Sequence, residues 1–361
     1  MSKDLIIDGG ESQVGGNGND VLTNSSLQYG GKGHDSLTNA GSQYGEYGND
    51  TLTNADNQFG GKGHDILSNA AFQYGGKGND ILNNGGDQYG EDGNDVLTNG
   101  ENQFGGNGRD ILRNATFQYG GKGNDTLDSG GFQYGEDGND VLTNGNSQYG
   151  GNGKDILTNA NSQYGGAGND ILNNGVFQYG EEGNDVLISG EKTTVMSGGT
   201  GNDVYFINKN IDPNLLAGTT QTIALDDAKG NDIISFENIT KSDLTFSREN
   251  DNLVINIKDA NKNVVISNWN TNKNNQIELF KLSDGSVITN KEINKEVFGI
   301  IDKKNVNTAV VDDGKFLSVT EIGKMINDIS SFASNSEATL VSTNSSKTDD
   351  LITLISNSGQ S

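Results

Sequence analysis

A pattern of 15 residues repeats twelve times in succession in this chain of 361 residues. Each copy reads Gln, aromatic, Gly, Gly or Glu, x, Gly, x, Asp, x, Leu, x, Asn, followed by three further residues. The first copy begins at Gln13 and the last at Gln178. A unit this short cannot bury a core by itself, so the copies must stack on one another. The repeat therefore predicts an all-β fold, a parallel β-roll or β-solenoid of about twelve 15-residue coils.

We number the unit from its Gln. Positions three to eight form a glycine-rich turn, such as 75–80, and positions nine to eleven form a short strand. Leucine occupies position ten in all twelve copies, so we expect it to point inward, with positions nine and eleven pointing outward. Asn or Ser at position twelve predicts a second corner, because Asn tolerates left-handed backbone, and we expect its side chains to stack between coils. A less favoured alternative counts 15 residues as half a coil.

The return strand carries Gln at position one and Tyr or Phe at position two, with Val14 in the first copy. Neighbouring residues of a strand face opposite sides, so only one of these two side chains points inward. We expect the aromatic ring to pack against the leucine and the Gln side chains to form an outer row. The reverse orientation stays open.

Aspartate occupies position eight in all twelve copies, directly after the glycine turn. In stacked copies these carboxylates would lie about 5 Å apart. Two negative charges at that distance repel by about 3 kcal/mol at an effective dielectric constant of 20. A hard cation such as Ca²⁺ takes six to eight oxygen ligands, which one turn cannot supply but two stacked turns can. We therefore predict roughly one Ca²⁺ per pair of stacked turns. The predicted metal ligands are Asp20, Asp35, Asp50, Asp65, Asp80, Asp95, Asp110, Asp125, Asp140, Asp155, Asp170, Asp185 and Asp203.

The composition excludes several classes of function. The formal net charge is −25, which argues against binding to nucleic acid or to anionic membrane surfaces. There is no cysteine, so disulfides, thiolate metal sites and cysteine nucleophiles are excluded. No apolar run reaches the length of a membrane helix, and residues 1–8 lack the apolar stretch of a secretory signal.

A second period of 45 residues lies over the first. Every third copy has Glu at position four, while several glycine copies carry Lys at position five. These glutamates are Glu46, Glu91, Glu136 and Glu181. Duplication of three-coil blocks explains this period, and a second interpretation is that acidic and Lys-bearing coils pair along one edge.

The turns resemble those of the RTX (repeats-in-toxin) calcium-binding proteins, whose usual unit is Gly-Gly-x-Gly-x-Asp-x-apolar-x. Residues 15–20 and 30–35 match this unit, 198–205 lie close to it, and 230–234 look like a degenerate copy. This chain departs from the family in its 15-residue period. The family places calcium turns on both edges of the coil, whereas here we expect them on one edge only.

The resemblance continues beyond the repeats. Residues 230–290 are similar to the β-rich segment that follows the repeats in many haemolysin-type secreted proteins, and Trp269 is expected in its core. Residues 319–333 have helical apolar spacing, and a Ser/Asn-rich tail follows. In the family, a tail of this kind is an uncleaved signal for type I export. The resemblance thus implies an N-terminal cap (1–12), a calcium-binding solenoid (13–203), a haemolysin-type domain (204–300) and an export tail (301–361).

The residues do not indicate an enzyme. The only histidines, His34 and His64, occupy position seven, where other copies have Asn, Arg or Lys, so they are interpreted as surface filler. No zinc-protease motif or Ser-His-Asp set is present in the sequence. An enzyme with its site in 204–300 is the weakest hypothesis, because no constellation of residues supports it.

The leading hypothesis is a secreted or cell-surface structural protein for matrix or adhesion, which folds on meeting extracellular calcium. Its expected partners are calcium ions and the type I export machinery, with a cell surface or self-association as further candidates. The main alternative is a toxin or bacteriocin-like effector. Because the repeats begin at Gln13, we expect no effector domain ahead of them. A flat ice-binding or adhesive face formed by the outward Val, Ile and Thr rows is a further alternative.

Overall fold

The computed structural model describes residues 4–300. They fall into two compact units that meet between Ser147 and Gln148, here called the first and second units and described separately. The predicted helix at 319–333 and the predicted export tail lie outside the described residues. The boundaries that the sequence predicts at 12, 203 and 300 stay predictions.

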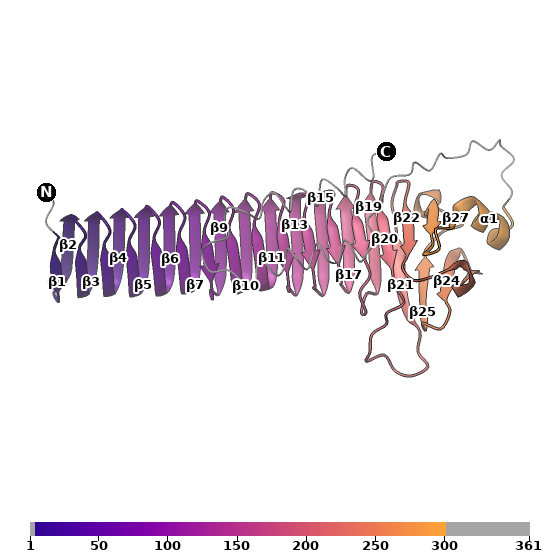
Figure 1. Ribbon diagram of the computed structural model, residues 1–361, viewed down its shortest axis with the longest axis horizontal. Helices are drawn as coiled ribbons and strands as arrows, with labels where there is room; N and C mark the ends of the chain where they lie inside the picture. The colour runs from indigo at the N-terminus through magenta and orange to yellow at the C-terminus, as the bar shows by residue number, and fades with distance from the viewer. Residues whose placement is uncertain (1–3, 301–361) are drawn as a thin grey trace. The chain divides into compact units, whose positions relative to one another are not determined.

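The first unit is a β-solenoid in which each 15-residue copy forms one full coil (Figure 1). Every strand pairs in parallel with the strand one copy later, so that Val21 pairs with Ser36 and Gln28 with Gln43. This register excludes the half-coil alternative. Several strands pass round the Asn corner without a break. The strands are β1 (Ile6–Asp8), β2 (Ser12–Asn17), β3 (Val21–Lys32), β4 (Ser36–Tyr47), β5 (Thr51–Lys62), β6 (Ile66–Lys77), β7 (Ile81–Asp92), β8 (Val96–Thr98), β9 (Asn102–Asn107), β10 (Ile111–Lys122), β11 (Thr126–Asp137) and β12 (Val141–Thr143).

The second unit continues the same coil pattern and then changes to a cap with antiparallel strands. Its coil strands are β13 (Ser147–Gly153), β14 (Ile156–Thr158), β15 (Ser162–Gly168), β16 (Ile171–Asn173), β17 (Phe177–Glu182), β18 (Val186–Ile188), β19 (Val195–Thr200) and β20 (Val204–Ile207). The cap holds β21 (Gln221–Asp226), β22 (Ile233–Phe236), β23 (Leu244–Glu249), β24 (Asn252–Ile257), β25 (Lys262–Ile266), β26 (Leu279–Lys281), β27 (Val287–Thr289) and the helix α1 (Asn290–Phe298).

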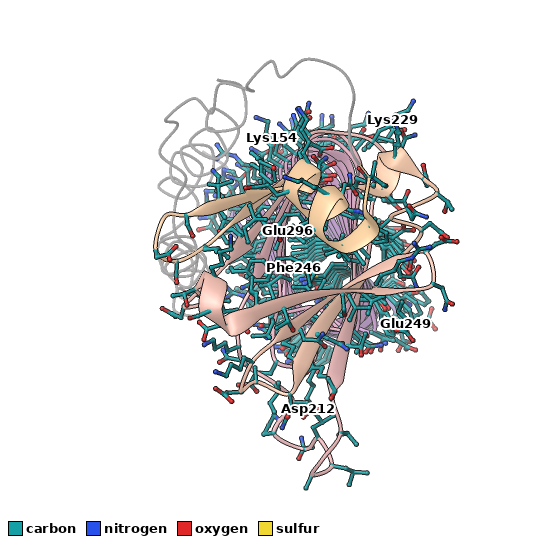
Figure 2. The ribbon with its side chains drawn as sticks, turned by 90° about the vertical axis from the view of Figure 1, so that its right-hand side faces the viewer. Lys154, Asp212, Lys229, Phe246, Glu249 and Glu296 are labelled. Carbon is teal, nitrogen blue, oxygen red and sulfur yellow. The ribbon has the colours of Figure 1, made fainter. Side chains whose placement is uncertain are left out.

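The cap is joined to the last coils through parallel pairing. Strand β21 pairs with β19 and β25, and β22 pairs with β20 and β26, whereas β23, β24 and β25 form an antiparallel meander. Trp269 is fully buried, as predicted, and its Nε1 donates to Asn294 Oδ1 of α1 at 2.7 Å. Phe246 packs edge-on against Phe280, and its position in the cap is labelled in Figure 2.

The core rows confirm one sequence prediction and overturn another. The leucines at position ten are fully buried, as expected. The prediction for the return strand is wrong, because Gln at position one is buried and the aromatic at position two is half-buried on the outer side. The rings stack on one another, with centroids 4.7 to 5.0 Å apart from Tyr29 to Tyr134 in the first unit.

The Gln row is stabilised by hydrogen bonds along and across the coil. Gln88 Nε2 donates to Gln73 Oε1 of the preceding coil at 2.9 Å and to the Thr98 carbonyl of the opposite strand at 3.1 Å. Its own Oε1 accepts from Gln103 Nε2 at 2.9 Å. A carboxamide carries both donors and an acceptor, so identical copies satisfy one another in the core. The aromatic rings of position two instead stack on one another on the outer side.

The second corner is as predicted. Position-twelve residues have left-handed backbone in every copy except the last, for example a φ of 58° at Asn54 and 57° at Ser129. Their side chains bridge successive coils, since Asn54 Nδ2 donates to Asn39 Oδ1 at 3.2 Å and Asn69 Nδ2 donates to Asn54 Oδ1 at 3.1 Å. The Asn row therefore fixes the corner opposite the glycine turn.

The outward row at position nine becomes more buried along the chain. Thr51 and Ile66 are exposed, as the period of two predicts, whereas Ile111 is half-buried and Val141 is buried. In the second unit, Ile156, Ile171 and Val186 at the same position are buried. The alternation of a strand fixes the face on which a side chain lies but not what covers that face, so the sequence pattern could not predict this burial.

The glutamates that mark the 45-residue period lie at a turn position with unusual backbone. The four glutamates at position four adopt φ angles of 75° to 79°, a left-handed region that glycine enters without strain. One predicted pairing of a Lys-bearing coil with an acidic coil is present, because Lys77 Nζ lies 2.9 Å from Asp92 Oδ2.

Replacing Gln88 by Ala should leave the Thr98 carbonyl, Gln73 Oε1 and Gln103 Nε2 short of a buried partner. We expect the free energy of unfolding, measured by urea titration in calcium buffer, to fall by about 2 kcal/mol or more. The exposed Glu101→Ala variant is the control and should change it little. Equal stability of the two variants would contradict the stabilising role of the buried Gln row.

Candidate metal centre

The glycine turn is shaped by how closely successive coils approach. Gly76 and Gly78 have φ angles of 107° and 134°. A Cβ added to Gly78 would lie 1.5 Å from the Gly63 carbonyl oxygen of the preceding coil. Any side chain at position six would therefore push the turns apart. The regular spacing between successive coils therefore depends on glycine at position six.

The position-eight aspartates form a continuous buried row in each unit, here called the aspartate ladder. In the first unit, Asp65 N–H donates to Asp80 Oδ1 and Asp80 N–H donates to Asp95 Oδ1, each at 2.7 Å. The exposed fraction of these side chains is 1% or less. One carboxylate oxygen per coil is thus used by the backbone amide of the preceding coil.

The second carboxylate oxygen has no hydrogen-bond partner. This orphaned atom is the buried Oδ2, and it recurs in all thirteen predicted ligands from Asp20 to Asp203. A Cβ added to Gly75 would lie 2.5 Å from Asp80 Oδ2 and 2.9 Å from the Gly90 carbonyl oxygen of the next coil. Two acceptor oxygens therefore flank the same point, which only glycine at position three leaves free. Such a pair requires a cation or a proton between them.

Burial makes the ionised form of these aspartates costly. It raises the pKa of Asp80 to about 6 and that of Asp110 to about 8, although the backbone amide of the preceding coil lowers both in part. In the second unit, burial and the charge of Asp170 raise the pKa of Asp185 to about 9. Desolvation is the main cause throughout, because it penalises the charged form of a carboxyl group.

The structure places each predicted ligand on one of the two ladders. The first unit holds Asp20, Asp35, Asp50, Asp65, Asp80, Asp95, Asp110, Asp125 and Asp140. The second unit holds Asp155, Asp170, Asp185 and Asp203. Each ladder brings neighbouring coils together, with Asp170 N–H donating to Asp185 Oδ1 at 2.8 Å.

The ladder of the second unit extends into the cap, which the sequence analysis missed. Asp203 N–H donates to Asp232 Oδ1 at 2.9 Å, and Asp232 N–H donates to Glu278 Oε2 at 2.8 Å. Asp232 ends the degenerate turn 230–232 and could have been included on that signal. Glu278 carries no such signal, because it precedes β26 without any glycine turn.

The interpretation of position seven as surface filler needs correction. His34 Nδ1 accepts from the Asn49 backbone N–H at 2.9 Å, and His64 Nδ1 accepts from the Asn79 N–H at 2.7 Å. Asn side chains at this position do the same through Oδ1, as Asn79 does for Asn94 N–H. Asn and His are therefore exchangeable because both offer an acceptor to the next coil.

The residues of the ladder fit a hard divalent cation. The groups that flank the space above glycine are an unpartnered carboxylate oxygen and a peptide carbonyl oxygen, which are ligand types that Ca²⁺ prefers. No thiol or imidazole ligand lies in the ladder, so soft or borderline metals are not favoured. The observation that decides the fit is the recurrence of an unpartnered, buried Oδ2 in each coil.

Comparisons with known proteins agree with this chemistry. Residues 252–292 match the family model described as the haemolysin-type calcium binding protein related domain. Together with the 15-residue coils, this match confirms the resemblance to RTX-type repeat proteins. No curated protein matches the chain.

One solved structure aligns weakly with the chain. It is the crystal structure of the extracellular lipase LipA from Serratia marcescens, with 16% identity over 72% of this chain and 39% of the lipase chain. Its TM-score of 0.12 is too low to support any conclusion about fold or function. Among residues 4–300, no helix is long and apolar enough to cross a membrane.

The raised pKa values predict that the metal-free array is more stable in mild acid. Between the ordinary value of 3.8 and the folded values of about 6 for Asp80 and about 8 for Asp110, the folded state binds more protons than the unfolded state. Stability in chelator should therefore fall as the pH rises from 5 to 8. Circular dichroism of the metal-free chain at both pH values, which reports the folded fraction, measures it. A rise in stability over this range would contradict the burial of these carboxyl groups.

Proposed function

We propose that this chain is a secreted, calcium-binding RTX-type repeat protein without enzymatic activity, which folds on meeting extracellular calcium and serves a structural or adhesive role outside the cell. The observation that carries the proposal is the orphaned Oδ2 repeated in each coil. The match of residues 252–292 to a haemolysin-type calcium-binding domain supports it independently. The type I export machinery is the proposed route, and a cell surface or further copies of the chain are proposed partners.

Calcium would be held by position-eight carboxylates together with the position-three carbonyl of the next coil. When bound, it supplies positive charge that offsets the burial of one carboxylate per coil. A ligand that binds only the folded state stabilises that state by mass action. In the cytosol, where calcium is scarce, the ionised ladder opposes closure of the coils, and at extracellular calcium concentrations this opposition is removed.

Removing calcium should therefore unfold the array at pH 8. We expect circular dichroism to show mainly unstructured chain in chelator and β-structure after addition of millimolar Ca²⁺. Magnesium at the same concentration is the control and should be less effective, because Mg²⁺ demands octahedral geometry and gives up its water reluctantly. A chain with full β-structure in chelator at pH 8 would overturn the coupling of folding to calcium.

The variant Asp80→Asn separates the cost of the charge from the benefit of the ion. An Asn at this position keeps Oδ1 for the Asp65 amide, and its NH₂ group can donate to the Gly90 carbonyl. We expect this variant to retain more β-structure than the unaltered chain in chelator at pH 8 and to gain less β-structure on addition of Ca²⁺. The exposed Asp56→Asn variant, which removes the same charge, should behave like the unaltered chain in both conditions.

Circular dichroism with and without calcium measures both effects. If Asp80→Asn retains less β-structure in chelator than the Asp56→Asn control, or gains as much β-structure from calcium as that control, position eight does not hold the ion. A lysis assay on the purified, calcium-loaded chain separates the structural role from the toxin alternative, since a structural protein should release no haemoglobin from erythrocytes.

A further inference from the structure

The second unit contains a cluster of acidic side chains that the repeat does not explain. One carboxylate oxygen each of Asp203, Asp227 and Asp232 lies within 4.8 Å of the other two. Within residues 4–300 this is the one group of three potential metal-binding side chains that come together so closely. The ladder itself offers only neighbouring pairs, because carboxylates two coils apart lie about 10 Å from each other.

The third carboxylate comes from outside the coil pattern. Asp203 and Asp232 are successive members of the ladder, positioned by the parallel pairing of β20 with β22. Asp227 follows directly after β21, in a connection that has no counterpart in the 15-residue unit. Figure 2 shows Lys229, of the same connection, at the edge of the second unit where Lys154 of a glycine turn also lies. The connection thus adds a side chain to the turn edge.

The two oxygens of each carboxylate have different surroundings, and the difference is the same in all three aspartates. Oδ1 accepts a backbone N–H in each case: from Asp185 to Asp203 at 2.8 Å, from Asp203 to Asp232 at 2.9 Å, and from Ala228 to Asp227 at 2.8 Å. Oδ2 of each is buried and receives no N–H or O–H donor among the described residues, while the Asp227 and Asp232 carboxyl groups lie close enough to share a proton. The residues are 0%, 1% and 5% exposed for Asp203, Asp232 and Asp227. Three clustered carboxylates therefore each keep one buried oxygen that no protein donor satisfies.

A neutral oxygen stands beside the cluster. Tyr205 pairs in register with Leu187, so its ring occupies the inward position that leucine has in every copy of the repeat. Its hydroxyl oxygen accepts from Gly198 N–H at 2.7 Å. A Cβ added to Gly198 would lie 2.4 Å from this oxygen and 2.2 Å from Asp203 Oδ2. The phenol therefore takes the place that the next glycine carbonyl holds in the array.

The protein supplies no positive charge to balance the cluster. Among residues 4–300, none of the three aspartates forms an ion pair with Lys or Arg. Buried carboxylates are normally paired or coordinate a metal ion, because an isolated buried charge is very costly. Three carboxylates and a phenol form an all-oxygen ligand set, which hard divalent cations prefer.

We propose that Asp203, Asp227 and Asp232 bind one Ca²⁺ ion at the last gap of the ladder, where Asp227 adds a third carboxylate, and that this ion joins the last coil to the cap. The proposal rests on the calcium chemistry of the proposed function but uses a carboxylate that the array does not contain. With three carboxylates instead of at most two, the site should fill before the ladder does. Calcium is favoured over Mg²⁺ because a buried site cannot provide the several water ligands that Mg²⁺ retains.

Native mass spectrometry of the full chain at increasing Ca²⁺ tests the site. We expect the first ion to bind the unaltered chain at least tenfold more tightly than the later ions, and Asp227→Asn to lose this ion. Asp259→Asn, an exposed charge change in the cap, should keep it. Asp80→Asn in the first unit should lose one of the later ions and keep the first. The site is disproved if Asp227→Asn binds the same number of ions with the same first affinity as Asp259→Asn.

The outcomes separate this site from the array. If the unaltered chain binds a single ion that Asp227→Asn loses, the site stands and calcium binding by the ladder fails. If ladder ions bind and Asp227→Asn matches its control, the site alone fails.

A second measurement needs no variant and so does not depend on how Asp227→Asn folds. A crystal of the unaltered chain grown with Tb³⁺, which replaces Ca²⁺, should show an anomalous peak about 2.4 Å from the three Oδ2 atoms. Peaks along the ladder with none at this cluster would overturn the proposal.

Discussion

The structure depends on a single constraint: a parallel register of 15 residues places each side chain directly over its own copy in the next coil. Every row must therefore be compatible with itself. Leucine rows pack, Gln and Asn rows pair donor with acceptor, and aromatic rows stack. The aspartate row is the exception, because its copies offer only acceptors and carry the same charge. The leucine, Gln, Asn and aromatic rows therefore stabilise the stacked coils. The aspartate row needs a proton or a cation, which the chain itself does not supply.

The group without a partner is one atom in each coil, the Oδ2 oxygen of the aspartate. Asp80 Oδ1 is satisfied by a backbone amide, whereas Oδ2 faces a carbonyl oxygen across the space above Gly75. A proton or a cation can occupy that space, and burial raises the pKa of Asp80 to about 6 and that of Asp110 to about 8, so the proton is released near neutral pH. Glycine at position three is thus as much a part of the site as the aspartate, since any Cβ there would fill the space.

The sequence predicts those features that follow from period and residue type alone. Coil length, buried leucines, the left-handed Asn corner and the common row of aspartates all belong to this group. The orientation of the return strand could not be predicted, because alternation is equally consistent with Gln or Tyr inside. The hydrogen bonds from Gln88 to two different strands decide it, and they exist only once the coils are stacked. Likewise, Asp227 and Glu278 reach the ladder through the folding of the cap, and no local pattern marks them.

The ladder does not require a fixed length of chain between its members. Its amide-to-carboxylate bonds span 15 residues in the array, 18 from Asp185 to Asp203, 29 from Asp203 to Asp232 and 46 from Asp232 to Glu278. Extra chain leaves the coil away from the turn and returns in register. Because every coil presents the same register to its neighbours, coils could be added or removed without changing the bonds that join the last coil to the cap. The number of coils is therefore set independently of the site at each turn.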